Sequence, residues 1–115
     1  MTSLRLDCVF YYVEDLDRAV HFYTAVLGLR LSSRDVVARF DVDGLLLELV
    51  PAGHPDLLSG RGNARLALAV EDIQTTAAEL RSRGAAVSEV QHVSNGWLAS
   101  LRDPDSNEIV LWQYA

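Results

Sequence analysis

The tetrapeptide Val13-Glu14-Asp15-Leu16 recurs almost unchanged as Val70-Glu71-Asp72-Ile73. The two copies lie 57 residues apart in a chain of 115 residues, so two such lengths cover nearly the whole sequence. A repeat on this scale predicts two copies of one supersecondary unit. Because a chain of this size fits one hydrophobic core, we expect a single domain built from two similar halves.

A helical pattern follows each copy of the motif. Apolar residues recur four and seven positions after Leu16 and after Ile73, which places them on one face of a helix. The aspartate before each of these residues stands at the N-cap position, where a carboxylate accepts from exposed N–H groups. Gly28 and Gly84 stand near the C-caps, where a left-handed residue is favoured. Both halves therefore predict the same helix.

Short apolar segments typical of strands surround each predicted helix. They cover residues 4–13, 29–33, 36–42 and 45–50 in the first half, and 64–70, 86–92, 97–102 and 108–114 in the second. Asp43-Gly44 is a strong signal for a two-residue hairpin turn. Each half thus reads βαβββ.

The domain organisation follows from this pattern. We expect module 1 at about residues 1–50, a linker rich in glycine and proline at about 51–63, and module 2 at about 64–115. The predicted fold class is α+β, with two βαβββ modules in tandem that form a curved mixed sheet around a cleft. Alternate side chains of each strand would then face this cleft.

Composition excludes several functions. Sixteen acidic residues against ten basic ones give a net charge of −6, whereas nucleic-acid binding needs a basic surface. Every basic residue is arginine, which removes lysine Schiff-base chemistry and the P-loop lysine. The single cysteine cannot form an intrachain disulfide, and no apolar run approaches the length of a membrane span. We expect a cytoplasmic protein with no nucleic-acid or membrane partner.

Two stretches carry a resemblance to a known family. Residues 13–29, VEDLDRAVHFYTAVLGL, resemble the first-module signature of the glyoxalase/bleomycin-resistance/dioxygenase group, also called the vicinal oxygen chelate superfamily. Residues 103–113, DPDSNEIVLWQ, resemble its closing hairpin. The resemblance implies the tandem βαβββ fold. It does not select one activity, because the group includes isomerases, ring-cleaving dioxygenases, epoxide-opening resistance enzymes and antibiotic-sequestering proteins.

The resemblance also implies where a divalent metal would bind, on the first and last strands of each module. Those positions fall at Cys8, Glu48, Arg65 and Val110. Arginine is cationic at any relevant pH and valine has no donor atom, so neither can be a ligand. A catalytic metal needs about three protein ligands, which Cys8 and Glu48 do not supply. The sequence therefore predicts no metal and no other cofactor.

Strand alternation then selects a candidate ligand site. If the positions named above face the cleft, so do aromatic residues two or four positions away on the same strands. The predicted ligand-binding residues are Cys8, Phe10, Tyr12, Glu48, Arg65, Trp97, Val110 and Trp112. Aromatic walls with few charges suit a small organic molecule, either aromatic or cationic.

Other interpretations of these residues stay open. The aromatic side chains could be core or dimer contacts, and Trp97 in particular could belong to either core or pocket. Arg65 could pair with Glu48, since a buried charge needs a partner, or it could anchor an anionic group of a ligand. No catalytic residue is identified.

The leading functional hypothesis is a metal-free protein of this family that binds a small aromatic or cationic molecule between its modules, with antibiotic sequestration as one form. The alternative is a lyase, isomerase or dioxygenase-type enzyme of the same superfamily, and a third is a dimerisation module. We also expect a homodimer, because open sheet edges are liabilities unless they are paired and twofold dimers are the commonest oligomers.

Overall fold

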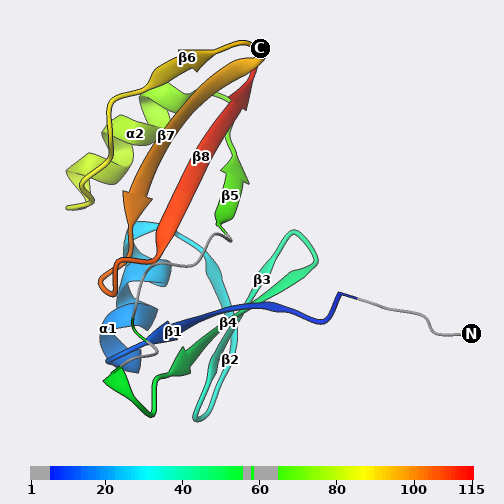
Figure 1. Ribbon diagram of the computed structural model, residues 1–115, viewed down its shortest axis with the longest axis vertical. Helices are drawn as coiled ribbons and strands as arrows, with labels where there is room; N and C mark the ends of the chain where they lie inside the picture. Colours follow the sequence, from blue (N-terminus) through cyan, green and yellow to red (C-terminus); the bar gives the residue numbers. More distant parts are fainter. Residues whose placement is uncertain (1–5, 56–57, 59–64) are drawn as a thin grey trace, which may run out of the picture.

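Two four-stranded mixed sheets form the protein, shown in Figure 1 as a computed structural model that describes residues 6–55, 58 and 65–115. The first sheet contains β1 (Val9–Val13), β2 (Arg30–Arg34), β3 (Ala38–Val42) and β4 (Leu45–Pro51) in the order β1-β4-β3-β2. The second contains β5 (Leu66–Ala69), β6 (Gln91–Val93), β7 (Gly96–Arg102) and β8 (Glu108–Tyr114) in the order β5-β8-β7-β6. The predicted α+β fold of two βαβββ modules is confirmed. Much of the predicted linker, residues 51–63, lies outside the described residues.

Both modules use the same strand pairing. The first strand runs parallel to the last strand of its module, and the other pairs are antiparallel. The turn between β3 and β4 is formed by Asp43 and Gly44, both with positive φ, at 55° and 83°. These angles match the twist of a two-residue hairpin, so the predicted turn is confirmed.

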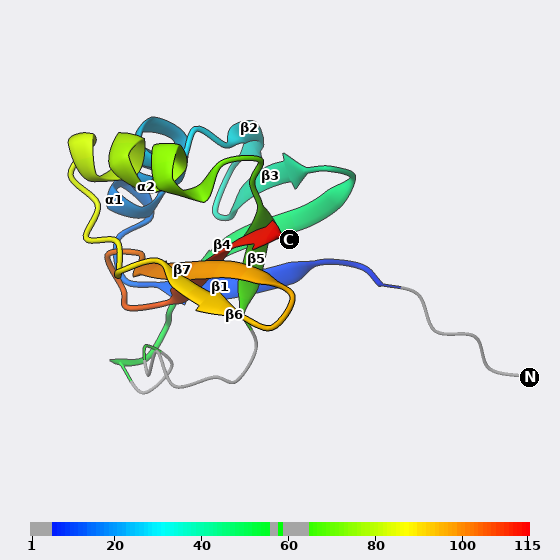
Figure 2. The ribbon, with the colours of Figure 1, turned by 90° about the horizontal axis from the view of Figure 1, so that it is seen from above.

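The two helices lie together on one side of both sheets (Figures 1 and 2). Helix α1 (Leu16–His21) continues into a π-helical turn, η1 (Phe22–Val26), and α2 spans Ile73–Ser82. The predicted N-caps are confirmed, since the carboxylates of Asp15 and Asp72 each accept from the backbone N–H three residues later, at 3.1 Å. Within the described part of the chain, none of the helices is both long and apolar enough to cross a membrane.

The π-helical turn corresponds to an extra residue. From Asp15 to Gly28 is one residue more than from Asp72 to Gly84, and both glycines have positive φ as C-caps require. The additional residue is accommodated by i to i+5 bonding, as in Leu27 N–H to Phe22 O at 3.0 Å. The two helices therefore start in register with the repeat and end one residue out of it.

The strand predicted at residues 86–92 is mostly wrong, because only Gln91–Val93 form β6. Ahead of β6, the Ser88 side chain takes the place of one of the backbone hydrogen bonds expected between this segment and β7. Its hydroxyl accepts from Ser100 N–H and its own N–H donates to Ser100 O, both at 2.8 Å. A side-chain bond on one side of this pair prevents regular pairing, so residues 85–90 have no regular structure beside β7.

The hydrophobic core fills the space between the sheets and the helices. Its largest fully buried side chains come from both modules and include Tyr23, Phe40, Leu47, Ile109 and Leu111. The buried residues of β4 and β8 are all odd-numbered, namely Leu47, Leu49, Ile109 and Leu111, so the even-numbered residues of these strands point to the opposite face.

Candidate functional site

One face of each sheet is not covered by any helix of the described residues (Figure 2). The register pairs Phe10 with Glu48 in the first sheet and Ala67 with Val110 in the second, so corresponding positions of the two modules lie on this face. We call this surface the open face, and it carries Cys8, Phe10, Tyr12, Arg39, Glu48, Arg65, Glu108, Val110, Trp112 and Tyr114. Seven of the eight predicted site residues are among them.

Glu48 is the centre of a polar cluster on the open face. Its Oε1 accepts from the Cys8 thiol at 3.2 Å, and its Oε2 accepts from Arg39 Nε at 3.0 Å. Arg39 also donates to Asp35 Oδ2 at 3.2 Å. Of the two interpretations left open for Arg65, pairing with Glu48 is not found, because Glu48 is paired with Arg39 on the neighbouring strand.

The hydrogen bonds of this cluster shift the pKa values of Cys8 and Asp35. The hydrogen bond to the Glu48 carboxylate, with desolvation as the second cause, raises the pKa of the Cys8 thiol to about 11. The thiol is therefore protonated and a poor nucleophile at neutral pH. At the outer end of the cluster, the Val37 N–H and then Arg39 lower the pKa of Asp35.

Arg65 forms an ion pair within its own module. Its Nε lies 2.6 Å from Glu108 Oε2, at the start of β8. Under this pair, the Tyr11 hydroxyl accepts from Leu66 N–H at 2.7 Å and donates to Glu108 O at 3.3 Å. Burial is the main cause that raises the Tyr11 pKa. Tyr11 thereby joins β1 to the first residues of β5 and β8, where the two modules meet.

Two aromatic pairs lie on the open face, one in each module. Phe10 and Tyr12 contact edge to face with ring centroids 5.3 Å apart, and Trp112 and Tyr114 do the same at 5.6 Å. Phe10 is 48% exposed and Tyr114 is 70% exposed. Such aromatic surface is available for stacking with a flat ligand.

Comparison with known proteins agrees with this architecture. The sequence profile of the Glyoxalase/Bleomycin resistance protein/Dioxygenase superfamily matches residues 5–111. The chain belongs to this superfamily. The resemblance inferred from residues 13–29 and 103–113 is thereby confirmed.

The individual proteins that this chain is similar to have names that describe different roles. A "Probable lactoylglutathione lyase" of Vibrio cholerae is 27% identical over 98% of this chain and 93% of its own length. The crystal structure of TnmS3, an antibiotic binding protein from Streptomyces sp. CB03234, is 28% identical, with a TM-score of 0.83 over 100% of this chain and 99% of that one. The fosfomycin resistance protein FosX from Mesorhizobium loti, at 15% identity and a TM-score of 0.76 over 99% and 95% of the chains, shares the fold.

The residues at the four positions where the resemblance implies a divalent metal do not fit a catalytic metal. Cys8 and Glu48 are hydrogen-bonded to each other, and the second oxygen of Glu48 is held by Arg39. Arg65 and Val110 stand at the other two positions, and neither side chain has an atom that can bind a metal. In the part of the chain that the structure describes, no three His, Cys, Asp or Glu side chains come together as a metal site.

Trp97 lies apart from the other predicted site residues. It pairs across the sheet with Gln113 and packs against the core, whereas the adjacent Leu98 pairs with Trp112. Alternation therefore puts Trp97 on the face opposite Trp112. Its ring stacks on His92 at 4.9 Å.

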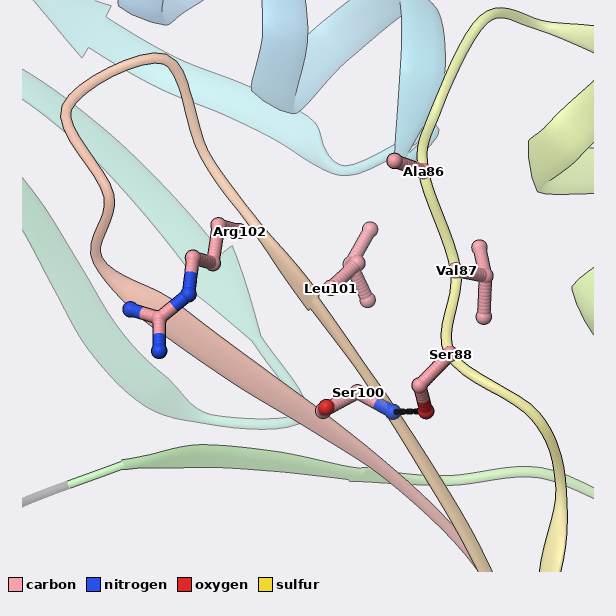
Figure 3. A pocket seen from close by; sticks show the side chains of 6 residues that line it. All are labelled: Ala86, Val87, Ser88, Ser100, Leu101 and Arg102. Carbon is pink, nitrogen blue, oxygen red and sulfur yellow. Dashed lines mark hydrogen bonds between the residues drawn. The ribbon is translucent and has the colours of Figure 1, made fainter.

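A hollow lies along the edge of β7 (Figure 3). It has a volume of about 400 Å³ and lies between the segment before β6 and strand β7. Its lining residues are Ala86, Val87, Ser88, Ser100, Leu101 and Arg102. It coincides with the stretch where Ser88 interrupts strand pairing, so it follows from the local backbone.

Sequence reasoning missed Arg39, although the sequence contained a signal for it. A two-residue turn at Asp43-Gly44 pairs Val42 with Leu45, and counting back along both strands pairs Arg39 with Glu48. Directly opposed residues of opposite charge attract each other across a sheet. The hairpin turn thus identifies the partner of Glu48.

Proposed function

We propose that the open face binds a small aromatic molecule without a metal, and that the protein sequesters this molecule instead of converting it. The two exposed edge-to-face aromatic pairs carry the proposal, because they place stacking surface in both modules on one face. The similarity to TnmS3, an antibiotic binding protein, over the full chain supports it.

The charges on the open face favour stacking as the main source of affinity. Each of its two glutamates is already paired with an arginine, Glu48 with Arg39 and Glu108 with Arg65. A cationic ligand would have to compete with these arginines for the carboxylates. Aromatic stacking needs no such exchange and contributes about 0.5–1.5 kcal/mol per contact beyond the buried area.

Two acridines of opposite charge test this proposal. 9-Aminoacridine and acridine-9-carboxylate share one flat ring system, so calorimetric titration with each separates stacking from charge. We expect both to bind, with dissociation constants within about tenfold of each other, a difference of 1.4 kcal/mol. Binding of neither compound, or of only one, would overturn the proposed role of stacking.

Fluorescence locates the bound ring. The chain has two tryptophans, so Trp97→Phe leaves Trp112 as the only one and Trp112→Phe leaves Trp97. We expect ligand quenching to persist in Trp97→Phe and to be mostly lost in Trp112→Phe, because only Trp112 lies on the open face. Quenching that follows Trp97 would place the site elsewhere.

The alternative function is enzymatic, and the relative named as a probable lactoylglutathione lyase is the observation that favours it. The arginine and valine at two of the four metal positions count against it. An assay of lactoylglutathione lyase activity, with and without added zinc or nickel, decides between the two. Turnover that depends on Glu48 would replace the binding proposal.

A further inference from the structure

The turn between β7 and β8 contains a buried polar network that the open face does not include. Asp103 is 5% exposed and is the centre of this network. Its Oδ1 accepts from the N–H groups of Asp105 and Asn107, at 2.9 and 2.8 Å. Its Oδ2 accepts from the Tyr23 hydroxyl and from Asn107 Nδ2, both at 2.9 Å.

This network crosses from one module to the other. Tyr23 belongs to the first helix, whereas Asp103 and Asn107 belong to the last hairpin. Asn107 Nδ2 also donates to the Tyr12 carbonyl at 3.1 Å, so a single amide group bridges Asp103 and β1. A second link lies close by, where Asp105 Oδ1 accepts from Glu14 N–H at 3.0 Å and from Arg18 Nη2 at 3.2 Å.

The position of Asn107 connects the network to the open face. Asn107 directly precedes Glu108, which pairs with Arg65, and it holds the backbone of Tyr12, which packs on Phe10. Asn107 is therefore one of the side chains, together with Tyr11 and Asp105, that link the two halves of the open face. Asp103 keeps that side chain oriented by accepting from it, and Tyr23 completes the set of donors around the buried carboxylate.

We propose that Asn107 is a positioning residue, which holds Tyr12 of module 1 in place relative to Glu108 of module 2 and so sets the geometry of ligand binding across the open face. This inference rests on the proposed binding function. Asn107 itself does not touch the ligand and acts through Tyr12 and Glu108. Tyr23 and Asp103 support it from the core.

The main test is Asn107→Asp, which keeps the shape of the side chain but replaces both amide donations with repulsion between oxygens. Tyr23→Phe is the milder second variant, since it removes one hydroxyl and leaves Asn107 in place. Ile73→Val is the control, because Ile73 is buried at the start of α2 outside the network. The variants are compared at matched fractions of folded protein.

Two measurements separate positioning from general stability. The first is affinity for 9-aminoacridine, which we expect to fall about tenfold in Asn107→Asp and less in Tyr23→Phe, as loss of one or two hydrogen bonds implies. The second is hydrogen exchange of the Glu14 amide, which is bonded to the same turn. We expect this amide to exchange faster in Asn107→Asp, while the amides of α2 keep their protection. In the control Ile73→Val, we expect no change in affinity and no selective change in the exchange of the Glu14 amide.

The outcomes distinguish this inference from the proposed function. If the unmodified protein binds neither acridine, the proposed binding function is wrong. Independently of binding, an unchanged exchange rate of the Glu14 amide in Asn107→Asp would refute the role of Asn107 in linking the two modules. If Asn107→Asp binds 9-aminoacridine as tightly as the unmodified protein does, the positioning role is wrong even though binding stands. A uniform loss of amide protection in all three variants would reduce Asn107 to a general contributor to stability.

Discussion

Replacing Glu48 with glutamine should make the Cys8 thiol more reactive. The carboxylate accepts the thiol hydrogen bond at 3.2 Å and is the largest cause that raises the Cys8 pKa to about 11. A neutral amide removes the charge that opposes thiolate formation, and it leaves Arg39 without one of its two acidic partners. Both changes favour the thiolate, so the pKa should fall towards the ordinary value for cysteine.

The size of the effect follows from two opposing terms. At pH 8, lowering the pKa from about 11 to about 9 increases the thiolate fraction about 100-fold. The intrinsic nucleophilicity of a thiolate falls with its pKa at a Brønsted slope of about 0.4–0.5, which offsets about tenfold of that gain. Reaction with a disulfide reagent should therefore become about tenfold faster, and somewhat less where desolvation keeps part of the shift.

The assay is simple because Cys8 is the only cysteine in the chain. The rate of labelling by an aromatic disulfide is measured from pH 7 to pH 9.5 in the unmodified protein, in Glu48→Gln and in Asp35→Asn. Asp35→Asn is the matched control, since it removes the other acidic partner of Arg39 without touching the thiol. An unchanged rate and pH profile in Glu48→Gln, or an equal acceleration in Asp35→Asn, would refute the assignment of Glu48 as the cause.

Four further predictions address other parts of the molecule. Burial and the neighbouring Asp103 raise the pKa of Tyr23 above its ordinary value of 10.0, so the free energy of unfolding should fall as the pH rises above 10. In denaturant titrations, Tyr23→Phe should reduce the slope of this free energy against pH by about 1.4 kcal/mol per pH unit. Equal slopes in the two proteins would contradict this prediction. Purified protein should carry far less than one equivalent of zinc, nickel, manganese or iron by elemental analysis, and the double variant Arg65→His, Val110→Glu should bind zinc more tightly; no gain would mean that these positions do not match the superfamily's metal site. In calorimetry, Arg65→Ala should weaken the binding of acridine-9-carboxylate but leave the binding of 9-aminoacridine unchanged or tighter, since the substitution frees the Glu108 carboxylate. Equal losses of affinity for both compounds would show that charge plays no part in binding. Light scattering should give twice the chain mass, because β2 and β6 leave sheet edges unpaired within the described residues, and a monomer mass in dilute solution would count against a homodimer.

The repeat in the sequence predicted the backbone well, for a physical reason. Caps, hairpin turns and alternation are local, and each depends on a few neighbouring residues such as Asp15, Asp72 or Asp43-Gly44. These elements appeared where the sequence placed them. The face of the first and last strand of each module also followed, because one buried face specifies strand register strongly, whereas Trp97 on β7 lies on the face opposite the one predicted.

The errors came from side chains that replaced backbone interactions or reached beyond one segment. Ser88 bonds to Ser100 and shortens the strand expected at residues 86–92. Arg65 pairs with Glu108 and not with Glu48, because the opposed residue on the adjacent parallel strand is nearer than a residue of the other module. The network around Asp103 was likewise beyond prediction, since its partner Tyr23 is 80 residues away in sequence.

The two modules also show why the repeat predicts positions better than chemistry. The register places Phe10 and Ala67 at equivalent positions, and it places Glu48 opposite the first and Val110 opposite the second. The residues across from these two are Arg39 in module 1 and Ser100 in module 2. Equivalent backbone sites thus hold an ion pair in one half and uncharged side chains in the other.

A metal bound between the modules would need donors from both of these equivalent sites. Module 2 instead places its ion pair two residues earlier, at Glu108, and uses its last strand for Trp112 and Tyr114. Aromatic side chains thus lie where a metal would need ligands from both modules. The carboxylates of Glu48 and Glu108 are each paired with an arginine of their own module. This asymmetry favours a surface that recognises one flat molecule by stacking over a centre that activates a substrate through charge.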